Sequence, residues 1–196
     1  MSTAIKSMSD LYVESLRDLY SAETQITKAL PKMAKAVESE ELKAGFEEHL
    51  EQTKNQIERL KKIFEGLGEK PTGHHCEAME GLIAEGQELM ESVKEPTVLD
   101  AGLIGAAQKV EHYEIAGYGT ARNFARLLGY DDHAELLQET LDEEGATDEK
   151  LTELADGMVN EAAVSATNGE SSQGNSRNGS SGSKSTTKTK AASGRK

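Results

Sequence analysis

Residues 104–129, IGAAQKVEHYEIAGYGTARNFARLLG, place small and apolar side chains at intervals of three and four. The positions on this face are Ile104, Ala107, Glu111, Glu114, Tyr118, Ala121, Ala125 and Leu128. Such spacing is typical of an α-helix that buries one face. Glu111 and Glu114 interrupt the face near its middle, where burying an unpaired charge is costly. The segment therefore predicts a long core helix, from near Thr97 to Gly129, with a carboxylate pair at its centre.

The same spacing recurs in three other long segments. The first carries Tyr12, Leu16, Leu19, Glu23, Ile26, Leu30, Met33 and Val37. The second carries Leu42, Phe46, His49, Thr53, Gln56, Leu60, Phe64 and Leu67. The last carries Leu137, Leu141, Glu144, Asp148, Leu151, Ala155 and Met158. Each face is apolar at its ends and polar near its middle, so the four segments predict four helices that share one core.

Capping and breaking residues set the limits of these helices. Ser39 and Asp131 are predicted N-caps of the second and last long helices, and Gly68 ends the second. Residues 76–93 form a shorter amphipathic segment, which Pro96 ends. We expect this segment to be a short helix on a long crossover connection.

Two long helices, a crossover with a short helix and two more long helices have the connectivity of ferritin-like bundles. The predicted fold class is therefore all-α, a ferritin-like four-helix bundle over residues 5–164. Residues 165–196 are rich in Ser, Gly, Thr, Asn and Lys and contain no apolar side chain larger than Ala. Such a composition predicts a disordered tail.

The charge is unevenly distributed along the chain. The formal net charge is -13, yet residues 165–196 contain six basic residues and one acidic residue. The acidic body would repel nucleic acid, so weak DNA contact is expected only through the tail. A solubilising extension is the favoured reading of the tail.

Targeting signals are not evident in the sequence. No run approaches 18 apolar residues, and MSTAIKSMSD at the start lacks a signal-peptide core. The single cysteine, Cys76, fits a reducing compartment. We expect a soluble cytoplasmic protein that does not associate with membranes.

The polar interruptions predict a metal site, because the midpoints of four bundled helices converge in space. Carboxylates buried together without a counterion would be very unfavourable. Carboxylate and imidazole ligands suit iron or manganese, and ligands from four helices can hold two ions. The candidate ligands are Glu23, His49, Glu111, Glu114, Glu144 and Asp148.

Interpretations without a metal remain open for several of these side chains. His49 could be a hydrogen-bonded core histidine, and a single glutamate such as Glu23 could face solvent. His74, His75 and Cys76 form a second group of potential ligands, but adjacent loop residues rarely chelate one ion, so a surface loop is favoured. Three tyrosines near the proposed depth are expected to pack in the core. They are Tyr20, Tyr113 and Tyr118.

Four motifs, taken together and in order, resemble the YciE and YciF family of bacterial stress proteins. They are DLYSAETQITKALPKMAKA (18–36), HLEQT with QIERL (49–60), AAQKVEHYEIAGYGTA (106–121) and LLQETLDEEGATDEKLTELA (136–155). The resemblance implies a rubrerythrin-like bundle, a homodimer, and induction under osmotic, oxidative or envelope stress. The usual di-iron pattern has Glu-x-x-His on two helices. Here Phe46 stands where the glutamate before His49 would be, and no histidine follows Glu144.

Three functions fit the sequence. The leading hypothesis is a stress-induced metalloprotein that consumes peroxide or oxidises Fe(II) at a dinuclear centre. The second is a non-enzymatic protective or binding protein whose polar core is a hydrogen-bonded network. The third is a DNA-associated protector tethered by its basic tail.

Overall fold

The computed structural model describes residues 5–72 and 74–173, with the side chains of 167–173 left aside. No strand occurs among these described residues. The helices are α1 (Met8–Ala36), α2 (Glu40–Leu67), α3 (Glu77–Ser92), α4 (Pro96–Leu127), α5 (Asp131–Leu154), the π-helical turn η1 (Ala155–Val159) and α6 (Asn160–Gln173).

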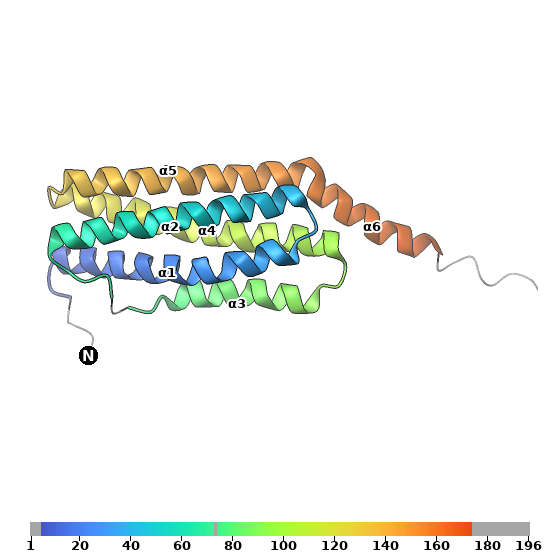
Figure 1. Ribbon diagram of the computed structural model, residues 1–196, viewed down its shortest axis with the longest axis horizontal. Coiled ribbons are helices and arrows are strands. Elements are labelled where there is room, and N and C mark those ends of the chain that lie inside the picture. The colour runs from blue at the N-terminus through green and yellow to red at the C-terminus, as the bar shows by residue number, and fades with distance from the viewer. Residues whose placement is uncertain (1–4, 73, 174–196) are drawn as a thin grey trace, which may run out of the picture.

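The four long helices α1, α2, α4 and α5 lie side by side in an elongated bundle (Figure 1). α1 packs against α2, α4 packs against α5, and further contacts join α1 to α4 and α2 to α5. The shorter α3 lies along the outside against α1 and α4. The predicted all-α bundle with a short crossover helix is thus confirmed.

Local signals explain where the helices begin and end. The Oγ atom of Ser39 accepts a hydrogen bond from the Leu42 amide at 3.2 Å, so Ser39 is the predicted N-cap. Gly68 ends α2 in the left-handed conformation with φ of 67°. The prediction for α5 was wrong by one residue. Its N-cap is Tyr130, and Asp131 instead begins the first turn, where its carboxylate faces the positive end of the helix dipole.

The register of the last helix changes after Leu154. The π-helical turn η1 contains an extra residue in the helical repeat, which rotates the buried face. Val159 is buried, whereas Met158, predicted to point inward, is 63% exposed. α6 then leads away from the bundle and continues past the predicted boundary at residue 164 to Gln173 (Figure 1). The remainder of the predicted tail lies outside the described residues.

The core consists of two apolar clusters separated by a polar layer. The crossover cluster contains Ala22, Ile26, Leu30, Ala34, Leu42, Phe46, Cys76, Met79, Leu99, Leu103, Ile104, Ala107, Leu151 and Val159. The opposite cluster contains Tyr12, Leu16, Leu19, Leu60, Ile63, Phe64, Tyr118, Ala121, Ala125, Ala134 and Leu137. Apart from Asp100, the buried polar residues of α2, α4 and α5 lie between members of the two clusters.

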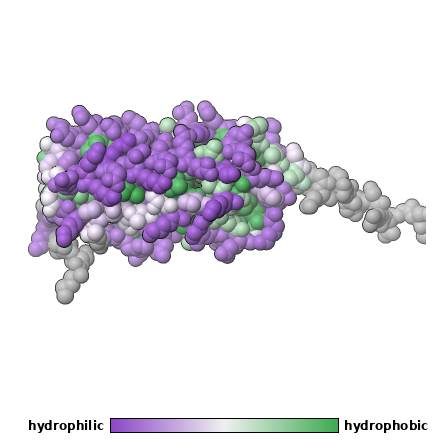
Figure 2. All heavy atoms as spheres, in the orientation of Figure 1, coloured by the Kyte–Doolittle hydropathy of each residue, from purple (hydrophilic) through white to green (hydrophobic). Residues whose placement is uncertain are grey.

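The outer surface of the bundle is predominantly hydrophilic, as Figure 2 shows for one face. This is expected of amphipathic helices, whose charged faces point to water. No described helix is both long enough and apolar enough to cross a membrane.

Candidate metal centre

A layer of buried polar side chains crosses the middle of the bundle. Its members, each at most 4% exposed, are Glu23, His49, Thr53, Gln56, Glu111, Glu114, Thr140 and Glu144. They come from all four long helices. Five of the six predicted ligands lie in this layer, so the predicted convergence of the helix midpoints is present in the structure.

Four of these side chains form a compact group. His49, Glu111, Glu114 and Glu144 each offer one ligand atom, and these atoms lie within 4.8 Å of one another. Nε2 of His49 is 3.3 Å from Oε1 of Glu111. Glu111 and Glu114 share a face of α4 because they are three residues apart. The group could hold a metal ion.

Burial opposes the charged forms of these carboxyl groups. It raises the pKa of Glu111 and that of Glu114 well above the usual range, and the charge of Glu144 raises both further. Burial also raises the pKa of Glu144, to about 7. Burial lowers the pKa of His49, which favours the neutral imidazole that binds metals.

Several polar atoms of the layer have no hydrogen-bond partner. Those on the proposed ligands are Oε2 of Glu23, Nε2 of His49, Oε2 of Glu111, both oxygens of Glu114 and Oε2 of Glu144. Buried polar atoms nearly always have partners, so each orphan requires an explanation. Oε1 of Gln56 in the same layer is also without a partner. The five orphaned oxygens on the proposed ligands are acceptors on acidic side chains, and a cation satisfies such a set. The donor set therefore fits a metal.

Glu23 lies beside this group rather than among the four. The hydroxyl of Tyr118 donates a hydrogen bond to Oε1 of Glu23. Burial raises the pKa of Glu23 well above its usual range, and the charge of Glu144 adds to the effect. Tyr118 was expected to pack in the core, and it does so while also orienting this carboxyl group.

The side chain of Asp148 lies outside the compact group of His49, Glu111, Glu114 and Glu144. Its side chain is 24% exposed and accepts a hydrogen bond from Nε2 of Gln108 at 3.1 Å. Its other oxygen lies 3.2 Å from Nε2 of His112. The inward face of α5 passes from Glu144 to Leu151, and Asp148 falls to one side of it, toward the exposed part of α4.

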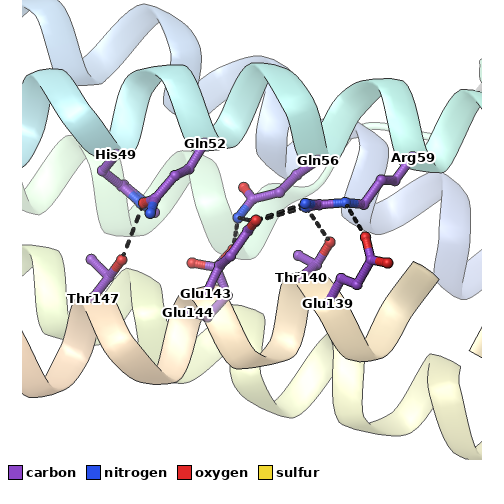
Figure 3. Close-up of polar contacts among 9 residues, drawn as sticks. All are labelled: His49, Gln52, Gln56, Arg59, Glu139, Thr140, Glu143, Glu144 and Thr147. Carbon is purple, nitrogen blue, oxygen red and sulfur yellow. Dashed lines mark hydrogen bonds and ion pairs between the residues drawn. The ribbon is translucent and has the colours of Figure 1, made fainter. Parts of the chain in front are cut away.

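Polar contacts between α2 and α5 support the group (Figure 3). Nδ1 of His49 is 3.5 Å from Oε1 of Gln52, which also accepts from the Thr147 hydroxyl at 3.5 Å. Because that oxygen can only accept, the contact favours the tautomer with the proton on Nδ1, in which Nε2 is available to a metal.

A second set of contacts fixes Glu144. Nε2 of Gln56 donates to Oε1 of Glu144 at 2.5 Å and to Oε2 of Glu143 at 3.1 Å. Arg59 binds Glu143 through two nitrogens at 2.7 and 2.6 Å (Figure 3). Arg59 and Glu143 were not predicted from the sequence. Neither residue interrupts an apolar face, so the periodic pattern contains no signal for them.

The second candidate group does not converge on one point in the part of the chain described. His74 lies 2.9 Å from Glu14, and His75 lies 2.9 Å from Glu80. Cys76 is buried, contrary to the expected surface loop, and its sulfur is 3.0 Å from the Tyr113 hydroxyl. Tyr20, expected in the core, packs edge-on against Phe64.

The fold and the site define a class of protein: helical bundles with a buried cluster of carboxylates and one imidazole. The chain matches, over residues 7–164, the family described as Domain of unknown function (DUF892). It is 51% identical over 160 residues to Protein YciF of Escherichia coli (strain K12), a match that covers 81% of this chain and 96% of that protein. The chain therefore belongs to the DUF892 family and is YciF-like.

Solved structures agree with this assignment. The crystal structure of the E. coli stress protein YciF superposes with a TM-score of 0.77, covering 80% of this chain and 99% of that one. The structure of YcfI from Rhodopseudomonas palustris is 48% identical in sequence and superposes with a TM-score of 0.75. The match covers 78% of this chain and 97% of that one. A protein from Xanthomonas campestris, 23% identical, shares the fold with a TM-score of 0.63 over 85% of this chain and 99% of its own.

Proposed function

We propose that the protein is a stress-response metalloprotein that binds two iron or manganese ions in the middle of its bundle. The proposed ligands are Glu23, His49, Glu111, Glu114 and Glu144. The observation that carries the proposal is the set of buried carboxylate oxygens without donors. A role in stress is supported by the 51% identity to the E. coli stress protein YciF.

Charge balance supports two ions rather than one. Four buried glutamates that are fully ionised carry four negative charges, which two divalent cations would neutralise. One divalent cation would leave two buried charges unpaired, at a large cost in free energy. Harder carboxylate ligands with a single imidazole suit iron or manganese better than copper.

The residues of the chain have separable roles in such a site. His49 would bind through Nε2, and the contact of Nδ1 with Gln52 would favour the required tautomer. Gln56 orients Glu144, while Tyr118 orients Glu23. When bound, a pair of such ions would supply redox chemistry toward peroxide or Fe(II).

Metal analysis of the reconstituted protein tests the proposal. After incubation with Fe(II) or Mn(II) and removal of free metal, we expect about two ions per chain. The variant Asp148→Asn is a matched control, because it removes a nearby carboxylate outside the group. A wild-type protein that stays metal-free after reconstitution would contradict the proposal.

A non-enzymatic protective protein is the alternative, and the hydrogen bonds around Gln52, Gln56 and Tyr118 favour it. In that case the polar layer is a structural network in which some carboxyl groups are protonated. The alternative predicts no peroxide turnover, and it predicts that Glu111→Ala affects function only through stability.

The homodimer, the cytoplasmic location and weak DNA contact through the tail stay predictions. With six basic residues in the tail, DNA binding should disappear between low and physiological salt. A gel shift that survives about 200 mM salt would support the tethered DNA protector instead.

A further inference from the structure

Two cavities reach the proposed metal centre from different sides of the bundle. The apolar cavity, of about 30 Å³, lies among α1, α2, α3 and α4. The polar cavity, of about 120 Å³, lies among α1, α2, α4 and α5. Both are lined by Leu30, His49, Ala107 and Glu111. These four side chains therefore form a wall that each cavity touches, and two of them belong to the proposed centre.

The apolar cavity has almost no hydrogen-bonding groups along its length. Its walls are formed mainly by aliphatic and methionine side chains, including Ile26, Met33, Leu82, Ile83, Met90 and Val110. The exposed Lys32 and Gln87 mark its outer end. At the inner end stand His49 and Glu111. A water inside it would lack the two to four polar partners that a buried water needs.

The polar cavity differs in its lining. Its walls are also mainly apolar, but Gln52 and Thr147 line it, and the exposed side chains of Glu48 and Lys150 form an ion pair of 2.5 Å at its rim. Water and ions would find partners in this cavity. Both cavities thus reach the same centre past mainly apolar walls, but only the polar cavity offers hydrogen-bonding groups along its length.

We infer that the apolar cavity is a binding site for a small uncharged gas molecule of the size of dioxygen, held against His49 and Glu111. The volume has room for about two or three water-sized atoms, which matches a diatomic gas. Apolar cavities of this kind stay dry and bind apolar gases. A functional role for the bound gas rests on the proposed function, but binding of a gas in the cavity can be tested without any metal.

Xenon, an apolar probe visible by anomalous scattering, tests the site in crystals of the metal-free protein under xenon pressure. We expect a peak inside the apolar cavity and none in the polar cavity. Because the probe needs no metal, a failed metal analysis would leave this result unaffected. A peak only in the polar cavity, or no peak, would overturn the inference.

A matched pair of variants on α4 links the xenon site to the cavity walls. Ala106→Leu places three extra carbons at a buried wall of the cavity, and Gly105→Leu adds its side chain where a Cβ meets nothing within 4 Å. The xenon peak should be lost in the first variant and retained in the second. If Ala106→Leu does not fold, Val110→Leu fills the same cavity from a half-buried position. A peak that persists in the filled variant would contradict the assignment.

Dioxygen itself can be used in solution as a second probe, because it is paramagnetic and speeds the relaxation of nearby methyl protons. We expect the largest enhancements at Ile26, Ile83 and Val110 of the metal-free protein. Leu16, Leu60 and Leu137 in the opposite cluster serve as controls, since none of them lines the apolar cavity. Equal enhancement in both sets would argue against a gas site.

Discussion

Two buried carboxylate sites in this bundle differ in a way that burial alone does not reveal. Asp100 is 3% exposed, yet both its oxygens accept backbone hydrogen bonds, from Glu38 at 3.0 Å and Ser39 at 2.8 Å. Glu114 is 1% exposed, and neither of its oxygens has a partner. Asp100 therefore ties the α1–α2 connection to α4, whereas Glu114 has no such partners and fits the proposed metal site. The number of partners, and not the burial, separates a structural acid from a proposed metal ligand.

The double substitution Glu111→Gln with Glu114→Gln should have the largest effect. It keeps side-chain size and removes two negative charges from the centre. We expect loss of most metal affinity, exceeding the roughly 10–100-fold loss caused by changes to outer ligand partners. At a pH where these carboxyl groups ionise, the metal-free variant should melt at a higher temperature than the metal-free wild type, because like-charge repulsion is removed.

Titration calorimetry with Mn(II) and thermal melts of the metal-free proteins would measure both quantities. If these carboxylates instead faced solvent, neither quantity would change much. A double variant that binds metal as tightly as the wild type would show that Glu111 and Glu114 are not metal ligands. The proposed difference between Glu114 and Asp100 would then have no basis.

The pH dependence of stability should report on the central carboxyl groups. The folded pKa of Glu144 is raised to about 7, and those of Glu111 and Glu114 are raised well above their usual range. Their protonation stabilises the metal-free fold fully below the unfolded pKa of about 4.5, and the effect is lost as pH rises through the folded pKa. Each such proton contributes a slope of about 1.4 kcal/mol per pH unit.

Urea unfolding of the metal-free protein between pH 5 and about 8 would show this loss of stability as pH rises. The double glutamine variant should give a flatter profile, since two of the titrating groups are gone. Bound metal should reverse the trend, because it replaces protons on the ligands. A metal-free wild type whose stability rises over this range would contradict the shifted pKa values.

Asp100→Ala should produce the opposite pattern of effects. It leaves two backbone amides at the α1–α2 connection without acceptors, each costing about 1–3 kcal/mol if it stays buried. We expect clear destabilisation in urea with an unchanged metal content. Loss of metal from this variant at temperatures where it remains folded would show that the two sites are coupled.

Asp148→Asn should have the smallest effect. The side chain is partly exposed and bonded to Gln108 and His112 rather than to the central group. We expect a change in stability of about 0.5 kcal/mol or less and the same metal content as the wild type. A large loss of metal would return Asp148 to the ligand set that the sequence pattern suggested.

The sequence predicts the helices and the buried polar layer well, because both depend on one periodic property. Glu23, His49 and Glu144 were found as polar interruptions of apolar faces, and all three are buried. The pattern failed for Met158, where the π-helical turn η1 shifts the register, a change that periodicity does not reveal.

Other features depend on how helices dock and leave no periodic signal. Arg59 and Glu143 lie at the edge between α2 and α5 and interrupt no apolar face. The burial of Cys76 depends on the crossover, which brings its sulfur to the Tyr113 hydroxyl of α4. The two cavities likewise depend on side-chain packing between helices.

Anomalous diffraction at the manganese edge, from crystals of the wild-type protein grown with Mn(II), tests the central claim most directly. The account predicts two peaks in the polar layer, within ligand distance of His49, Glu111, Glu114, Glu144 and Glu23. The absence of a peak there would contradict it. Peaks confined to surface carboxylates, such as Glu14 and Asp18 beside His74, would contradict it as well.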